Sequence, residues 1–145
     1  MSFWRDNILS NKTDIARRDY QLPSDFTINN LDVYIPDHLN LIHNFLSKNY
    51  ITSANNDVTL SYPKPVLIWL LRQTTPDLCL GFFYKNMIIG FICAVPVSIV
   101  VDNNEQQLFH IDLFCVHTKM RKKGIGRYLL FEIENRIVQG GCDKA

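Results

Sequence analysis

Residues 111–130 read IDLFCVHTKMRKKGIGRYLL, and this stretch decides how the chain folds. Its first part contains a short, β-prone apolar run, Leu113 to Val116, which predicts a strand. After the polar middle part, apolar residues recur every four positions, at Ile125, Leu129, Ile133 and Ile137. This spacing predicts an amphipathic helix of about four turns. The stretch therefore predicts a strand, a turn and a helix.

The turn carries glycines and basic residues. Gly124 and Gly126 stand at the start of the predicted helix, where glycine lets the backbone approach a ligand closely. The free N–H groups and the positive dipole end of a first helical turn favour an anion. Basic side chains gather there, at Lys119, Arg121, Lys122, Lys123 and Arg127. A diphosphate group would fit this pattern, but so would a tight turn on a solvated basic surface, and short glycine motifs match by chance often.

The motif Arg-x-x-Gly-x-Gly resembles the pyrophosphate loop of the GNAT superfamily of acyl-CoA N-acyltransferases. Phe114-Cys115-Val116-His117, followed by Lys119 and Arg121, is similar to the Phe-Leu-Cys-Val-His-Lys-Lys-Leu-Arg signature of protein N-myristoyltransferases. Further motifs of that family follow in the same order along the chain: Phe3-Trp4, Leu22-Pro23, Phe26, Asn49-Tyr50, Tyr62, Trp69-Leu70-Leu71-Arg72 and Gly90-Phe91-Ile92-Cys93-Ala94-Val95-Pro96. The resemblance runs from Phe3 to Ile137. It covers the first of the two fused GNAT-like halves of that family.

The resemblance implies an acyl-CoA-dependent N-acyltransferase that moves a myristoyl or other acyl group from CoA to an amine, in this family a protein N-terminal glycine. It implies that the backbone N–H groups of Leu113 and Phe114 form the oxyanion hole, with the family's Phe-Leu pair reversed. The implied CoA-binding residues are Phe3, Trp4, Cys115, Val116, Arg121, Lys122, Lys123, Gly124, Ile125 and Gly126. Acyl-CoA is then a co-substrate. We expect no permanently bound cofactor and see no metal-ligand spacing.

A catalytic base is harder to assign. In the resembling family the base is the carboxylate that ends the second half. Here His110 and Asp112 project from one face of a strand, because alternate residues share a face, and either is a candidate base. Such residues are more often hydrogen-bonded strand groups. We expect His117 to brace the turn.

Two other functions stay open. Gly124 and Gly126 depart from that family's Arg-x-Ala/Pro and match the general GNAT pattern, which favours generic acyl-CoA use over strict myristoyl-CoA use. One alternative is therefore a general GNAT acetyltransferase. The other alternative is a non-catalytic acyl-CoA-binding or regulatory remnant that lacks the peptide-binding half. Where the resembling family has an acidic peptide-binding run, this chain has Thr52, Ser53, Ala54 and Asn55. This departure weakens the case for a peptide substrate.

Composition narrows the setting. The chain has 145 residues and a formal charge of +1, which fits one globular domain and predicts neither a nucleic-acid nor a membrane partner. Cys79, Cys93, Cys115 and Cys142 show no C-x-x-C spacing, and most lie in apolar runs, so we expect a reduced, cytoplasmic protein. No signal peptide or apolar span is apparent. Ser2 follows the initiator Met, so we do not expect the chain itself to be myristoylated.

Residues 1–25 are expected to form an N-terminal arm and residues 26–145 a partial GNAT-like domain. The predicted fold class is α/β (α+β): a GNAT-like mixed, mostly antiparallel sheet flanked by helices, truncated before the fifth strand. A second copy or another partner chain then completes the sheet, or its edge stays open. The predicted elements are a first strand that includes 26–28 and 31–34, a helix from Pro36, a loop at 50–64, a buried helix at 65–72, strands at 78–84, 87–101 and 108–116, and turns at 85–86 and 102–106. Pro96, inside an apolar strand, predicts a bulge or splay.

Overall fold

The structure is a computed structural model that describes residues 19–140 apart from 54 and 56. Its centre is an antiparallel sheet in the order β1-β4-β5-β6, formed by Phe26–Asn30, Cys79–Tyr84, Met87–Val101 and Asn104–Val116. β5 lies between β4 and β6, as its almost wholly apolar sequence predicts. Apart from the GNAT-like assignment and the truncation, this architecture confirms the predicted fold class.

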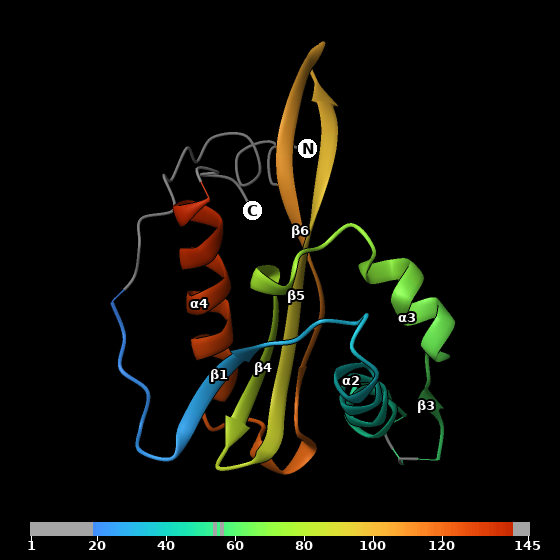
Figure 1. Cartoon of the computed structure of the whole chain (residues 1–145), viewed down its shortest axis with the longest axis vertical. Helices are drawn as coiled ribbons and strands as arrows, with labels where there is room; N and C mark the ends of the chain where they lie inside the picture. Colours follow the sequence, from blue (N-terminus) through green and yellow to red (C-terminus); the bar gives the residue numbers. More distant parts are fainter. Residues whose placement is uncertain (1–18, 54, 56, 141–145) are drawn as a thin grey trace.

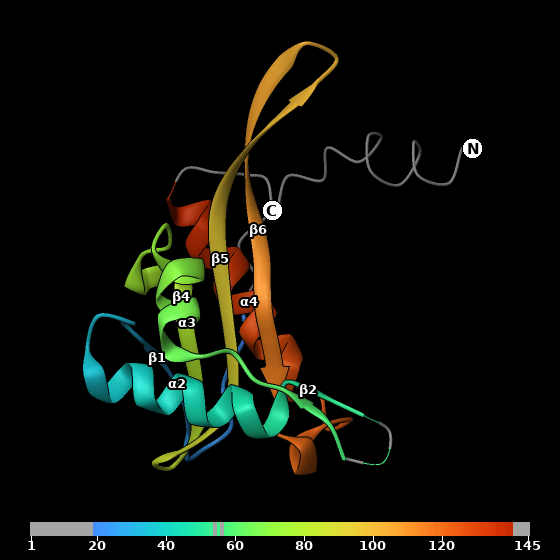
Figure 2. The ribbon, with the colours of Figure 1, turned by 90° about the vertical axis from the view of Figure 1, so that its right-hand side faces the viewer.

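Two hairpins connect the last three strands. Lys85 and Asn86 join β4 to β5, as predicted. Asp102 and Asn103 join β5 to β6 and have φ angles of 49° and 61°, which is the geometry of a two-residue type I′ turn. The predicted turn at 102–106 was therefore too long. The resulting β5–β6 ribbon extends well beyond the helices (Figures 1 and 2).

Helices cover both faces of the sheet (Figure 1). α4 (Ile125–Gln139) lies on one face, where Leu129, Ile133 and Ile137 are buried. Gly90 of β5 allows this close approach, because a Cβ there would lie 2.8 Å from a Leu129 methyl carbon. α2 (Pro36–Asn49) and α3 (Lys64–Leu71) cover the other face, and their buried residues form a second core with Phe91, Cys93, Leu113 and Cys115.

Several sequence predictions were wrong in detail. Residues 31–34 do not extend β1 but lead into α2. The predicted loop at 50–64 contains a short hairpin of β2 (Ile51–Thr52) and β3 (Thr59–Leu60). α3 buries only one side, so Trp69 stays 58% exposed, with the Arg72 guanidinium 5.5 Å from its ring centre. The apolar composition of this helix hid its exposed side.

The predicted irregularity at Pro96 was also wrong. Pro96 pairs in register with Phe109, and its neighbours Val95 and Val97 pair in register with the residues next to Phe109. The register shifts nearer the start of β5, between Phe91 and Cys93. The bulged strand there is β6.

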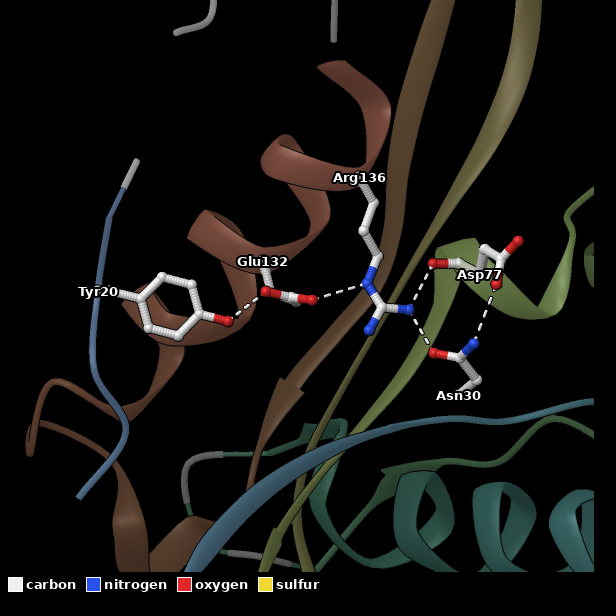
Figure 3. Close-up of polar contacts among 5 residues, drawn as sticks. All are labelled: Tyr20, Asn30, Asp77, Glu132 and Arg136. Atoms are coloured by element: carbon white, nitrogen blue, oxygen red, sulfur yellow. Dashed lines mark hydrogen bonds and ion pairs between the residues drawn. The ribbon is translucent and has the colours of Figure 1, made fainter. Parts of the chain in front are cut away.

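A polar network ties β1 and the chain before it to α4 (Figure 3). Tyr20 donates a hydrogen bond to Glu132, and Glu132 pairs with Arg136 at 2.8 Å. Arg136 also donates to the side chain of Asn30 and, at 3.0 Å, to the carbonyl of Asp77, which lies in the short 3-10 helix η1 (Pro76–Leu78). Partial burial and the neighbouring Glu132 raise the pKa of Tyr20 above its ordinary value.

We expect Tyr20→Phe to lower the free energy of unfolding by about 1 kcal/mol at neutral pH, because it removes the hydrogen bond to Glu132. A raised folded-state pKa stabilises the fold below the unfolded value of about 10, and this contribution is lost as the pH rises above it. The deficit should therefore shrink between about pH 10 and 11 in urea titrations. Tyr34→Phe, at an exposed tyrosine, is the control. A deficit that stays constant across this range would contradict the prediction.

Candidate functional site

The bulge lies where β6 approaches the glycine turn. Phe91 pairs with Cys115 and Cys93 pairs with Asp112, so Leu113 and Phe114 both stand opposite Ile92. Leu113 has a φ of 50°, a left-handed conformation that costs free energy for a leucine. A bulge of this kind releases backbone groups from the ladder and redirects them. The two residues with this geometry are those predicted to form an oxyanion hole.

Packing holds the bulge on both sides of the sheet. Leu113 is 1% exposed and belongs to the core under α2 and α3. The Phe114 ring lies against the first turn of α4, where a Cβ on Gly126 would lie 2.8 Å from its Cζ atom. The missing side chain at Gly126 therefore seats the Phe114 ring. This contact connects the bulge directly to the glycine turn.

Asp112 lies next to the bulge, and its carboxylate contacts the backbone of the bulge. Its Oδ1 accepts a hydrogen bond from the Leu113 N–H at 2.7 Å, and its carbonyl accepts one from the Cys93 thiol at 3.2 Å. Because Asp112 pairs with Cys93, its side chain lies on the sheet face covered by α2 and α3. His110 pairs with Val95 further from the bulge and is exposed. Of the two candidate bases, Asp112 is the one placed at the bulge.

Aromatic and thiol groups surround this point. Burial, reinforced by the charge of Asp112, raises the pKa of Tyr50, whose ring centre lies 6.2 Å from that of Tyr62. Burial raises the pKa of the Cys115 thiol to about 11 and raises that of Cys93 further. Both thiols are therefore protonated near neutral pH, and they serve as apolar packing groups.

The glycine turn leaves the start of α4 open to an anion. η2 (Thr118–Met120) follows β6, and His117 Nδ1 accepts a hydrogen bond from the Lys119 N–H at 3.2 Å, which confirms that His117 braces the turn. Gly124 has a φ of 73°, which suits glycine. The first turn of α4 has no acidic residue, and no side chain of the described residues caps it. Its N–H groups and the exposed Lys122 and Lys123 can therefore receive a phosphate.

Arg121 and Asn49 hold the turn against the end of α2. The Arg121 guanidinium donates to the carbonyl of Val116 at 3.1 Å and to that of Asn49. Asn49 is 4% exposed; its side-chain oxygen accepts from the Thr118 N–H at 3.1 Å, and its amide nitrogen donates to the Phe45 carbonyl at 2.9 Å. In this structure Arg121 thus fixes the turn. The sequence analysis named Asn49 only as part of the Asn49-Tyr50 pair in the resemblance and predicted no role for it.

The remaining predicted residues divide into two groups. Cys115 is buried, Val116 is partly buried, and Ile125 packs into the α4 side of the core. Phe3 and Trp4 lie outside the described residues.

Among the described residues, no group of His, Cys, Asp or Glu side chains gathers in a way that could hold a metal ion. No helix in the described part of the chain is long and apolar enough to cross a membrane.

Residues 7–145 match the family model of the N-terminal domain of myristoyl-CoA:protein N-myristoyltransferase. The chain belongs to the N-myristoyltransferase family. It is 29% identical over 128 residues to the glycylpeptide N-tetradecanoyltransferase of Plasmodium falciparum, covering 86% of this chain and 31% of that protein. It is 27% identical over 144 residues to glycylpeptide N-tetradecanoyltransferase 2 of Bos taurus, covering 95% of this chain and 28% of that protein.

The fold agrees with this family. The crystal structure of Saccharomyces cerevisiae N-myristoyltransferase with bound myristoyl-CoA matches with a TM-score of 0.79 and 26% identity. The match covers 89% of this chain and 32% of the yeast protein. The chain thus spans about a third of the length of the N-myristoyltransferases that it resembles.

We expect Gly126→Ala to displace the Phe114 ring, because the added Cβ would lie 2.8 Å from Cζ. The amide resonances of Leu113 and Phe114 should then shift in ¹H–¹⁵N NMR spectra. Gly140→Ala at the other end of α4 is the control, since its Cβ would meet its nearest atoms at 3.4–3.5 Å. Unchanged resonances at the bulge in Gly126→Ala would show that the contact does not couple the two segments.

Asn49→Ala should lower the free energy of unfolding by about 2 kcal/mol, because the Thr118 N–H loses its partner inside the protein. The Thr118 amide should also exchange faster with solvent. Asn44→Ala, at an exposed asparagine of the same helix, is the control and should change neither quantity much. Urea titration and amide exchange measure the two effects. Equal losses in both variants would contradict the bracing role of Asn49.

Proposed function

We propose that this chain binds an acyl-CoA and transfers the acyl group to an amine, with myristoyl-CoA as the donor and a protein N-terminal glycine as the acceptor. One observation carries the proposal: a bulge at Leu113–Phe114 and an uncapped helix start at Gly124 belong to one continuous strand-turn-helix. The first can bind a thioester oxygen and the second a diphosphate. Family membership and the yeast relative with bound myristoyl-CoA support this reading.

The CoA diphosphate is proposed to bind at the start of α4. Backbone N–H groups from Gly124 to Gly126 would donate to phosphate oxygens, and Lys122 and Lys123 would supply positive charge from exposed positions. Arg121 would act mainly by holding the turn through the carbonyls of Val116 and Asn49. Pantetheine would then run along the end of β6, past Cys115 and Val116, toward the bulge.

The thioester carbonyl is proposed to sit at the bulge. As the amine attacks, the carbonyl oxygen becomes negative, and the N–H groups of Leu113 and Phe114 would stabilise that charge. Backbone donors serve whichever side chains they carry, so the reversed Leu-Phe order is compatible with this role. The left-handed backbone of Leu113 is held by its burial, which fixes the direction of its N–H before substrate binds.

Asp112 is the proposed base. The ammonium form of the acceptor would transfer one proton to the Asp112 carboxylate, and the neutral nitrogen would attack the thioester carbon. The tetrahedral intermediate would then release the CoA thiolate as the carbon–sulfur bond breaks, and the thiolate would take up the second proton, which the acylated nitrogen loses as it becomes a neutral amide; Asp112 would return its proton to water. The products are an amide and free CoA. Asp112 is favoured over His110 because it lies at the bulge.

Acyl-CoA binding without transfer is the second candidate. It is favoured by the loop between α2 and α3, where Ser53 and Asn55 stand in place of the carboxylates that the resemblance associates with peptide binding. A general acetyltransferase of GNAT type is a further alternative, and the preference for acyl-chain length would separate it from an N-myristoyltransferase.

β6 is the last strand in the order of the described sheet, and we propose that a second copy or a partner chain pairs with it. We propose a cytoplasmic location.

Calorimetric titration with myristoyl-CoA, acetyl-CoA and free CoA tests the proposal. We expect myristoyl-CoA to bind most tightly, because burial of a fourteen-carbon chain contributes about 0.8 kcal/mol per methylene. Gly124→Glu should abolish binding, because its carboxylate repels the diphosphate. Gly124→Gln is the matched control: it strains the left-handed position equally but adds no charge, and it should retain most of the affinity.

Four results would change the conclusion. Equal affinity for all three ligands would favour a general GNAT site. Equal loss in the Glu and Gln variants would assign the effect to backbone strain and remove the support for an anion site at this turn. No binding of any ligand by the wild-type chain would overturn the proposed function. Tight myristoyl-CoA binding without transfer to any glycine-terminated peptide would favour the binding protein.

A further inference from the structure

We propose that the Asp112 side chain is a gate on the oxyanion hole. Its carboxylate accepts a hydrogen bond from the Leu113 N–H, which is the donor that the thioester oxygen needs. An acyl-CoA must therefore displace the carboxylate before its carbonyl can bind. This inference rests on the proposed function and adds how the same site is controlled.

The Asp112 carboxylate resembles, in charge and in position, the oxyanion that would take its place on the Leu113 N–H. Asp112 Oδ1 is a negatively charged oxygen 2.7 Å from the Leu113 nitrogen, as the oxyanion of the reaction would be. A thioester oxygen in the ground state carries less charge than a carboxylate. The carboxylate therefore competes well against the substrate and less well against the transition state.

The bulge explains why a carboxylate reaches this N–H. Leu113 lies in the bulge together with Phe114, and its N–H donates to Asp112 Oδ1. Asp112 is the preceding residue, and its side chain lies on the face of its cross-strand partner Cys93. The hydrogen bond therefore joins two consecutive residues. Breaking it requires rotation of the Asp112 side chain and no movement of the sheet.

The gate would couple binding to proton transfer. While Asp112 Oδ1 accepts from the Leu113 N–H, that oxygen is turned toward the backbone. Once the thioester oxygen takes that N–H, the displaced carboxylate is free to turn toward the amine and accept its proton. The base therefore becomes available when an acyl group is in place.

A pair of ligands isolates the gate. Myristoyl-CoA has the carbonyl oxygen, whereas S-tetradecyl-CoA is a thioether that lacks it but retains the CoA and a long alkyl chain. We expect Asp112→Ala to raise the affinity for myristoyl-CoA about tenfold, because a charge-assisted hydrogen bond no longer competes. Affinity for the thioether should change far less. Turnover should be lost in spite of tighter binding.

Two variants control the measurement. Asp112→Asn keeps an oxygen acceptor without the charge, so its affinity for myristoyl-CoA should fall between those of wild type and Asp112→Ala. Glu105→Ala removes an exposed carboxylate near the ribbon end of β6 and should not alter the ratio of the two affinities. Circular dichroism establishes that each variant is folded, and the Leu113 amide resonance in NMR spectra should move in Asp112→Ala without any ligand.

The outcomes separate the gate from the proposed function. A gain limited to the thioester supports the gate. Equal gains for both ligands, or no gain, would overturn it while leaving acyl-CoA binding intact, because the removal of a negative charge alone would explain an equal gain. Failure of every variant to bind either ligand would overturn the proposed function and the gate with it.

Discussion

The left-handed backbone of Leu113 is the constraint on which the site depends. A leucine adopts a φ of 50° at a cost, and the surrounding structure keeps it there. Its side chain is buried under α2 and α3, and the next residue, Phe114, packs on the opposite side against α4. The two residues are thus held from both faces of the sheet. The N–H group that results is fixed before any ligand arrives.

Two sets of contacts join this bulge to the glycine turn. Phe114 rests on Gly126, and Arg121 with Asn49 fastens the turn to the end of α2. An acyl-CoA bound with its diphosphate at the start of α4 would consequently have its thioester placed at the bulge, which these same contacts hold in position. Enzymes gain much of their rate from such positioning, because it removes the entropic cost of bringing reactants together.

The sequence predicted the parts that depend on local pattern. The four-residue periodicity identified α4, and apolar runs identified the two hairpin strands β4 and β5 and the strand leading into the glycine turn. The sequence could not locate the bulge. Proline is the residue whose own chemistry disfavours a strand, so the sequence pointed to Pro96, whereas Leu113 is held in its conformation by packing. Asn49 was missed as a brace for the same reason: its partner Thr118 lies far along the chain. The exposure of Trp69 also depends on the tertiary placement of α3.

We would first determine a crystal structure of the chain with a myristoyl-CoA analogue whose thioester is replaced by a ketone. We expect the ketone oxygen to accept hydrogen bonds from the Leu113 and Phe114 N–H groups. We also expect the diphosphate to lie on the first turn of α4 and the Asp112 carboxylate to have turned away from Leu113. A ketone oxygen bound elsewhere, or an Asp112 carboxylate still on the Leu113 N–H, would show that the bulge is not the site of the thioester carbonyl.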